Sequence, residues 1–441
     1  MLPFVIGVCA VLVGVVKSSH YGIQHHPPSP HSAVEAPPLP HAPFSAPIVS
    51  RTSRRASKTH ALHSLRAGKS YTVPVVGADY DYEYLTNITI GGQSFLVIVD
   101  TGSSDTWLAQ KGFSCFNLTG APEPTSTCAF GSDGFDTKLS KSFQWYPNTT
   151  FALEYGDGES LTGSAAFETV SIDGLTVKDQ EIGVVSKASW VGDGINTGLL
   201  GLAYPWLTSI TNSQGRKLQY NPFFFNAVKQ KQVSSYFSLA LNRGTANGMR
   251  SPGIDPHLGY LAFGGIAQVP VTSNRVTVPI QGYSIATRAP TSSRHPTYFY
   301  YTVDVQEYVF PNSSGVATAS NSTIIDSGTT LNLVPTEVAR AYNAAFNATW
   351  RSGSYYVDCK AEAPPFAVVL RGKTFTIDPR DQVVYAGTDE NGDAVCMSGT
   401  QDGGPQTMGS VFILGDVFLH NVVTTFDIQR NQITFTQRKY Y

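Results

Sequence analysis

Short runs of apolar residues, separated by residues that favour turns, make up most of the sequence after Tyr71. Leu85 to Ile90 and Phe95 to Val99 are two such runs, and Gly91-Gly92 lies between them. Apolar or alternating runs of about four to eight residues, bounded by glycine, are typical of β-strands joined by tight turns. The pattern therefore predicts a mainly β protein from Tyr71 onward.

Helical spacing is rare. One helix is predicted to begin near Pro335, because apolar residues follow that proline at helical intervals, at Val338, Tyr342 and Ala345/Phe346. A second helix is predicted around Phe223 to Lys231. We expect only a few short helices beside the strands.

The beginning of the chain has a different pattern. Leu2 to Val16 is a stretch of 15 uncharged, mostly apolar residues, which is shorter than the ~20 residues of a membrane-spanning helix. We interpret residues 1–19 as a secretory signal peptide, with a buried N-terminal strand as the alternative. Residues 20–70 contain eight prolines and seven of the ten histidines, and such a segment cannot build a core.

Charge separates this first part from the rest. Residues 1–70 hold seven Lys or Arg and one acid, Glu35, so they carry +6, while the remainder carries −8. This balance disfavours a nucleic-acid role for the folded part. It also suggests that residues 20–70 are a detachable, inhibitory pro-segment that docks on the acidic remainder; the alternative is a solvated linker. A length of 441 residues predicts two or three folded units.

The strongest pattern is an internal repeat. An apolar strand ends in Asp100-Thr-Gly-Ser-Ser, and another ends in Asp326-Ser-Gly-Thr-Thr. Each is followed by a second apolar run that ends in glycine: Gly201 comes 101 residues after Asp100, and Gly415 comes 89 residues after Asp326. Two copies of this order predict two similar lobes, residues 71–268 and 269–441, that face each other across a pseudo-two-fold axis.

Asp followed by a hydroxyl residue and Gly can hold a carboxylate in a fixed position. Glycine permits a close approach of the opposite loop, and neighbouring hydroxyls and amides hydrogen-bond the carboxylate oxygens. One such triplet is an ordinary turn. Two copies, each with its own later apolar run, are far harder to explain as ordinary turns.

These motifs resemble the pepsin-like aspartic proteases. Asp100 to Trp107 and Asp326 to Thr330 resemble the two active-site motifs, and Tyr155 to Gly158 resembles the flap. The resemblance covers about Tyr71 to Tyr441. It implies an all-β, bilobal pepsin-like double β-barrel with pseudo-two-fold symmetry and a few short helices.

The resemblance also implies roles for individual residues. Asp100 and Asp326 would share one proton and hold the attacking water, since two close carboxylates do not both ionise readily. The supporting residues would be Thr101, Gly102, Ser103, Ser327, Gly328 and Thr329, and the substrate-binding residues Ile98, Trp107, Tyr155, Gly156 and Asp157. Ser327 stands where the family usually has Thr, and it keeps the hydroxyl.

The flap departs from the usual family pattern Tyr-Gly-x-Gly-Ser-x-x-Gly. Glu159 stands before Ser160, which lengthens the flap by one residue and predicts an added charge near the cleft. Asp157 matches a position where fungal members often carry Asp, a feature associated with tolerance of Lys at P1. The alternative is a turn residue between two glycines.

Cysteines and glycosylation sequons favour an oxidising compartment. Cys9 lies in the predicted signal, and of the three pairings open to the other four cysteines we predict Cys115 with Cys128 and Cys359 with Cys396, because each pair lies within one half of the chain. Sequons occur at Asn87, Asn117, Asn148, Asn312, Asn321 and Asn347. No C-x-x-C or H-E-x-x-H occurs, so we expect no metal and no cofactor.

The sequence thus predicts a secreted, extracellular aspartic endopeptidase, with the vacuole as second destination. Expected partners are protein or peptide substrates, pepstatin-type inhibitors and its own pro-segment. The end of the sequence, Gln437 to Tyr441, has no apolar tail, so we expect no membrane anchor, and we expect a monomer. A two-carboxylate glycosidase would not need mirrored loops. A pepsin-fold protein that has lost catalysis and acts as a binding or inhibitor protein remains the main alternative.

Overall fold

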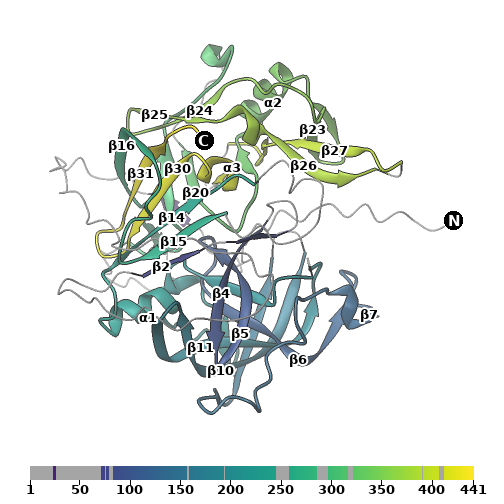
Figure 1. The fold of residues 1–441 in the computed structure, drawn as a ribbon, viewed down its shortest axis with the longest axis vertical. Helices are drawn as coiled ribbons and strands as arrows, with labels where there is room; N and C mark the ends of the chain where they lie inside the picture. Colours follow the sequence, from purple (N-terminus) through teal and green to yellow (C-terminus); the bar gives the residue numbers. More distant parts are fainter. Residues whose placement is uncertain are drawn as a thin grey trace, which may run out of the picture.

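The computed structural model describes most of the chain after residue 70. The described residues are 23–25, 71–74, 76–78, 83–155, 158–192, 194–244, 258–285, 296–315, 321–389, 391–406 and 412–441. The predicted signal peptide and nearly all of the predicted pro-segment lie outside these ranges. Figure 1 shows a purple and blue lobe built from the first half of the chain, below a green and yellow lobe built from the second half.

Strands dominate the first lobe. An 11-stranded sheet has the order β13-β9-β10-β11-β6-β12-β5-β4-β3, with β7 beside β6 and β8 beside β10. Its strands are β3 (Val76–Ala78), β4 (Glu83–Ile90), β5 (Gln93–Asp100), β6 (Thr106–Phe116), β7 (Pro122–Glu123), β8 (Gln144–Trp145), β9 (Thr149–Glu154), β10 (Ser160–Ile172), β11 (Leu175–Ser189), β12 (Gly198–Gly201) and β13 (Ile210–Asn212). The predicted strand pair on either side of Gly91-Gly92 is the β4–β5 hairpin, so that prediction is confirmed.

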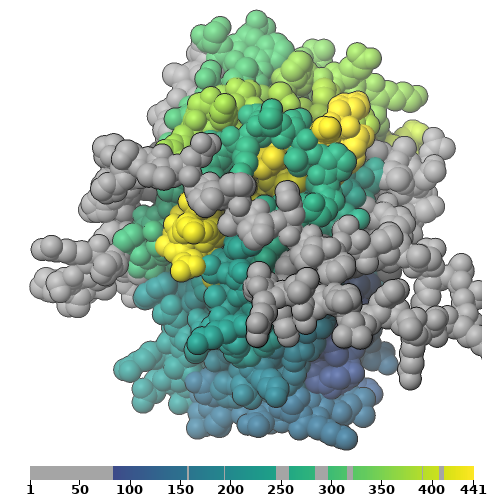
Figure 2. Space-filling view, turned by 60° about the vertical axis from the view of Figure 1, so that its left-hand side comes forward, coloured from purple at the N-terminus to yellow at the C-terminus, as the bar shows by residue number. Residues whose placement is uncertain are grey.

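A six-stranded sheet joins the two halves of the chain. Its order is β16-β31-β30-β14-β15-β2, with bounds β2 (Tyr71–Pro74), β14 (Tyr236–Leu241), β15 (Gly259–Phe263), β16 (Val271–Pro279), β30 (Val422–Asp427) and β31 (Gln432–Arg438). Figure 2 shows yellow residues from near the C-terminus on the same face as teal and green residues from the middle of the chain. The two lobes are therefore joined by backbone pairing.

The second lobe contains three smaller sheets. Their orders are β18-β20-β29-β21-β28, β19-β24-β25 and β22-β23-β27-β26. The strands are β18 (Thr302–Val305), β19 (Glu307–Val309), β20 (Asn321–Ile325), β21 (Asn332–Val334), β22 (Thr349–Arg351), β23 (Ser354–Val357), β24 (Phe366–Leu370), β25 (Lys373–Ile377), β26 (Val383–Thr388), β27 (Ala394–Ser398), β28 (Thr400–Asp402) and β29 (Phe412–Leu414). β1 (Ile23–His25) pairs with β17 (Tyr283–Ile285).

Helices are short in the described part of the chain. They are α1 (Phe223–Lys229), α2 (Thr336–Ala345) and α3 (Asp416–Leu419), with 3-10 helices η2 (Thr125–Thr127), η3 (Pro205–Leu207), η5 (Ser313–Gly315) and η6 (Pro379–Gln382). α2 begins directly after Pro335, as predicted, and buries Val338 and Tyr342. α1 ends two residues before the predicted end, because the backbone turns at Lys231 with φ of +58°.

The internal repeat corresponds to a structural repeat. β5 runs parallel to β12, which places Gly201 opposite Asp100. β20 runs parallel to β29, which places Leu414, the residue before Gly415, opposite Ile325, the residue before Asp326. In each lobe the later apolar run therefore lies beside the strand that leads into an aspartate.

Both predicted disulfides, Cys115–Cys128 and Cys359–Cys396, are present. The sequons differ in accessibility. Asn87, Asn148, Asn312 and Asn347 are exposed, and Asn117 is half-buried, with its amide nitrogen bonded to Glu123. Asn321 requires a correction. It is 6% exposed on β20, and its side-chain oxygen accepts hydrogen bonds from Tyr308 and Thr323, so a glycan at Asn321 is incompatible with this fold.

Candidate active site

Asp100 ends β5, and the residues that follow it hold its carboxylate. The Gly102 amide donates to Oδ1 at 2.7 Å, and the Ser103 hydroxyl donates to Oδ2. The side chain is buried at 4% exposure. Both oxygens thus accept hydrogen bonds from the turn, which fixes the plane of the carboxylate.

Asp326 follows β20 and has the same surroundings. The Gly328 amide donates to its Oδ1 at 2.9 Å, and the Thr329 hydroxyl donates to its Oδ2 at 2.7 Å. The repeated sequence has therefore produced two equivalent carboxylate sites, one from each lobe.

The hydroxyls of Thr101 and Ser327 connect the two loops. The Thr101 hydroxyl donates to the Ile325 carbonyl at 2.9 Å and accepts from the Ser327 amide at 3.0 Å. The Ser327 hydroxyl donates to the Val99 carbonyl at 2.7 Å and accepts from the Thr101 amide at 3.2 Å. The serine hydroxyl at position 327 thus makes two of the four hydrogen bonds of this reciprocal cross-link, one as donor and one as acceptor.

The two glycines of these loops allow the carboxylates to approach each other. A Cβ atom added at Gly102 would lie 2.5 Å from Oδ1 of Asp326, and one added at Gly328 would lie 2.5 Å from Oδ1 of Asp100. Any other residue at either position would push the loops apart. Each glycine is therefore required by the opposite aspartate.

Burial and proximity shift the acid–base behaviour of the pair. Burial raises the pKa of Asp326 well above its usual range, and the nearby negative charge of Asp100 raises it further. Burial also raises the pKa of Asp100, but hydrogen bonds from Ser103, Gly102 and Asp326 oppose that shift. Two buried carboxyl groups this close do not both ionise readily, so the raised pKa of Asp326 favours a state in which the pair keeps one proton.

The flap tyrosine lies against the first lobe. Its hydroxyl accepts a 2.9 Å hydrogen bond from the indole nitrogen of Trp107. Burial raises the pKa of Tyr155 well above its ordinary value, and the charge of Asp100 adds to the shift, so the phenol stays protonated. Ile98 lies on β5 in the same apolar cluster as Tyr155 and Trp107. Gly156 and Asp157 lie outside the described residues.

Tyr300 was not assigned to this site from the sequence, and the buried position of Glu159 was not predicted. Burial raises the pKa of Tyr300, and the charge of Asp326 adds to the shift. Its only sequence signal is an aromatic run, residues 298–301. Glu159, expected to add charge near the cleft, has a buried carboxylate that accepts from the Val191 amide at 2.7 Å.

Within the described ranges, no group of three or more His, Cys, Asp or Glu side chains is placed to hold a metal ion. None of the helices in that same part of the chain has the length and apolar character needed to span a membrane.

Comparisons with known proteins agree with this geometry. Residues 83–438 match the family model of the eukaryotic aspartyl proteases. A probable aspartic-type endopeptidase of Aspergillus fumigatus is 37% identical over 367 residues, which are 80% of this chain and 78% of that protein. Aspergillopepsin-1 of Emericella nidulans is 28% identical, covering 85% and 83% of the two chains, and cathepsin D of Dictyostelium discoideum is 29% identical, covering 88% and 91%.

One solved structure that matches is the aspartic proteinase of Irpex lacteus. It has a TM-score of 0.62 and 19% identity, and the match covers 84% of this chain and 98% of that one. At this identity the likeness shows the fold alone. It confirms the predicted all-β, bilobal architecture.

Proposed function

The chain belongs to the eukaryotic aspartyl proteases, and from that premise we propose that it hydrolyses peptide bonds at acid pH with water activated between Asp100 and Asp326. It is an aspartic-type endopeptidase that acts on protein or peptide substrates. The observation that carries the mechanism is the pair of buried carboxylates, held by equivalent hydrogen bonds yet shifted unequally in pKa.

Unequal protonation supplies an acid and a base at one pH. Ionised Asp100 takes a proton from water as the water oxygen bonds to the carbonyl carbon of the substrate, while Asp326 gives its proton to the carbonyl oxygen. The resulting tetrahedral diol then loses its C–N bond. The proton on Asp100 passes to the leaving amine, and Asp326 regains a proton from a diol hydroxyl. No acyl-enzyme forms.

The remaining site residues act by positioning. Thr101 and Ser327 keep the loops in register through their cross-link, and Tyr155 closes over bound substrate, which excludes water and orients the scissile bond. Ile98 lines an apolar pocket for the P1 side chain, and Asp157 pairs with Lys or Arg at P1. Pepstatin-type inhibitors would occupy the same cleft.

We place the enzyme outside the cell and assign it a zymogen stage. Residues 1–19 would be the signal peptide, residues 20–70 the inhibitory pro-segment, and residues 71–268 and 269–441 the two lobes of a monomer. The charges of +6 and −8 on the two parts of the chain support docking of the pro-segment. Two disulfides support an oxidising destination.

The test is cleavage of a peptide library by the acid-treated protein, with and without a pepstatin-type inhibitor. Asp326→Asn should abolish cleavage, because it removes one of the two carboxyl groups that share a proton. It should leave the melting temperature almost unchanged, because the side-chain volume changes little. Asp133→Asn, at an exposed aspartate of the first lobe, is the matched control and should cleave like the parent. Full activity in Asp326→Asn would refute the mechanism, whereas peptide binding without cleavage by the parent would support the binding-protein alternative.

A further inference from the structure

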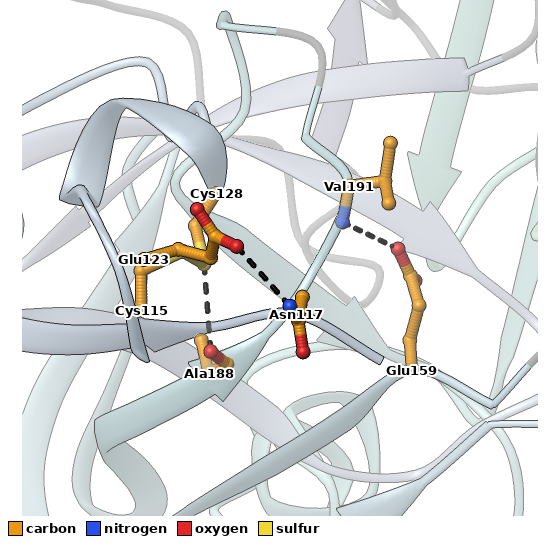
Figure 3. The surroundings of a disulfide bond; sticks show 7 residues. All are labelled: Cys115, Asn117, Glu123, Cys128, Glu159, Ala188 and Val191. Atoms are coloured by element: carbon orange, nitrogen blue, oxygen red, sulfur yellow. Dashed lines mark hydrogen bonds between the residues drawn. A yellow bond between two sulfur atoms is a disulfide. The ribbon is translucent and has the colours of Figure 1, made fainter. Parts of the chain in front are cut away.

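The buried carboxylate of Glu159 stands out in the flap hairpin. Its side chain is 2% exposed, and Oε1 accepts a 2.7 Å hydrogen bond from the Val191 amide. Figure 3 shows the side chain extending toward Val191, with a dashed line that joins its carboxylate to the Val191 amide nitrogen. Burial of a carboxylate costs free energy unless its oxygens are bonded, so this position has a specific partner.

The backbone of Glu159 is joined to the flap tyrosine. The Tyr155 amide donates to the Glu159 carbonyl at 2.8 Å, and the Gly158 amide donates to the Tyr155 carbonyl at 3.1 Å. These two bonds close the base of the flap turn between β9 and β10. A movement of Glu159 would therefore move Tyr155.

The segment that Glu159 contacts is packed against the same tyrosine. The Trp190 ring lies edge-on to Tyr155 with centroids 5.7 Å apart, and edge-on to Trp107 at 5.4 Å. It also stacks on Phe130 at 6.0 Å. The neighbour of Val191 thus belongs to the aromatic cluster that surrounds the Tyr155 phenol.

The first disulfide fixes this segment in the lobe. β6 pairs with β11 so that Ala188 lies opposite Cys115, and the Cys128 sulfur is 3.4 Å from the Ala188 carbonyl oxygen. A Cβ atom at Gly192 would lie 2.4 Å from the Cys128 carbonyl oxygen, so the two segments are in direct backbone contact. We call residues 128–131 and 188–192 the flap wall.

We infer that Glu159 is a positioning residue that tethers the flap to the flap wall and thereby sets the position of Tyr155 over the Asp100–Asp326 pair. The inference rests on the proposed function, since the position of Tyr155 matters for catalysis only if the dyad is catalytic. At acid pH a protonated carboxyl group still offers its carbonyl oxygen to the Val191 amide. The tether therefore persists where the dyad works.

The test compares Glu159→Ala and Glu159→Gln with the parent. Amide hydrogen exchange of the flap peptides gives a readout that needs no activity. In Glu159→Ala we expect the Tyr155 and Gly158 amides to exchange about 10-fold faster. We expect kcat/KM to fall about 10-fold to 100-fold, mainly through a higher KM, because the hydrogen bond to the Val191 amide is lost from a loop that closes on bound substrate. Glu159→Gln keeps the acceptor oxygen and should restore both quantities.

The melting temperature separates positioning from general destabilisation. Val191 is 61% exposed and thus lies at the surface of the lobe, so the loss of the bond to its amide should be local, and Glu159→Ala should melt close to the parent. Asp133→Asn, at an exposed aspartate of the same lobe, is the control and should match the parent. Parent-like flap exchange in Glu159→Ala, or a Gln variant as defective as Ala, would overturn the inference. If the parent cleaves no peptide but the exchange pattern holds, the proposed function fails and the tether stands.

Discussion

The Ser327 hydroxyl makes two hydrogen bonds from one lobe to the other, and a single substitution can remove both. Ser327→Ala leaves the Val99 carbonyl and the Thr101 amide without these partners in a buried region. Loss of one partner of a buried hydrogen bond costs about 1–3 kcal/mol. We expect kcat to fall at least about 10-fold, because the loops carry the dyad, while Ser327→Thr should keep activity within about 3-fold of the parent.

Steady-state kinetics at acid pH and a melting curve for each variant check this prediction. A Ser327→Ala enzyme with the parent's kcat would show that the cross-link is dispensable for the alignment of the carboxylates.

At the scale of residues, the sequence identified what is encoded locally. The carboxylates of Asp100 and Asp326 accept hydrogen bonds from residues two and three positions later, so the motif itself includes the donors that hold each carboxylate. Tyr300 and Glu159 have no such motif. Their surroundings include Asp326 and Val191, which lie near them only in the folded chain. The sequence alone does not show whether a Glu side chain is buried or exposed.

At the scale of elements, the turn between β4 and β5 gives a test with an internal control. Gly91 and Gly92 have φ of +56° and +79°. A Cβ at Gly91 would lie 2.6 Å from the Cβ of Ser140, whereas a Cβ at Gly92 meets no atom within 4 Å. Gly92→Ala should therefore lower the free energy of unfolding only by the cost of a left-handed backbone conformation, about 1–2 kcal/mol. Gly91→Ala should lower it clearly more, because its Cβ atom also meets Ser140.

Denaturant unfolding of both variants measures the difference. Equal losses of unfolding free energy in the two variants would mean that the loop around Ser140 can move aside without destabilising the fold.

The elements themselves were predictable where the pattern is strong. Alternation and glycine pairs located β4 and β5, and a proline followed by helical spacing located α2. The predicted end of α1 was two residues too late, because Lys231 adopts a left-handed conformation that its residue type does not predict. Strand partners distant in sequence were not predictable, since the parallel pairing of β5 with β12 joins segments about a hundred residues apart.

At the scale of the whole molecule, a buried polar network connects the lobes. Tyr84 on β4 donates to the Asn242 carbonyl at 2.9 Å and is hydrogen-bonded to Nε2 of His420. The Nδ1 atom of His420 lies 3.1 Å from Oδ1 of Asp381, which also accepts from Arg243 at 2.6 Å. Burial alone would raise the pKa of Asp381, but His420 and Arg243 outweigh it and lower that pKa to about 2.

This shift predicts how stability depends on pH. A carboxyl group whose pKa is lower in the folded state stabilises the fold above its unfolded pKa of about 3.9, and the contribution is lost as pH falls through about 2. The contribution is about 3 kcal/mol. Asp381→Asn should therefore lower the melting temperature at pH 5, and the gap to the parent should narrow toward pH 2.

Thermal melts from pH 5 to pH 2 provide the measurement, with Asp358→Asn, on an exposed aspartate of the same half of the chain, as control. A gap that stays constant over this range would contradict the assignment of the low pKa to Asp381. The sequence held no signal for this network, because its members come from four separate segments that are far apart in the sequence.

The charge division of the full chain leads to the last prediction, which concerns activation. Residues 20–70 carry +5, since Lys17 of residues 1–70 lies in the predicted signal, and the remainder carries −8. At neutral pH these charges should attract each other, and a Lys or Arg near the dyad would keep both carboxylates ionised and inactive. Acid protonates carboxylates of the remainder and so weakens docking, while the seven histidines of residues 20–70 gain charge near pH 6.5 and repel the basic run beside them.

We therefore expect the chain from His20 onward to be inactive at pH 7 and to lose its pro-segment when shifted to pH 4, with mass and activity changing together. Replacing the seven histidines by Gln should leave the pH 7 state inhibited and slow the release at pH 5 to 6, where only the histidines gain charge in large numbers. Adding Asp326→Asn separates self-cleavage from cleavage by another protease. In this variant the segment should still undock at acid pH, but the chain should stay uncut. Full activity at pH 7 with residues 20–70 still attached would show that the segment is a passive linker, since an inhibitor held by charge must act where both charges are present.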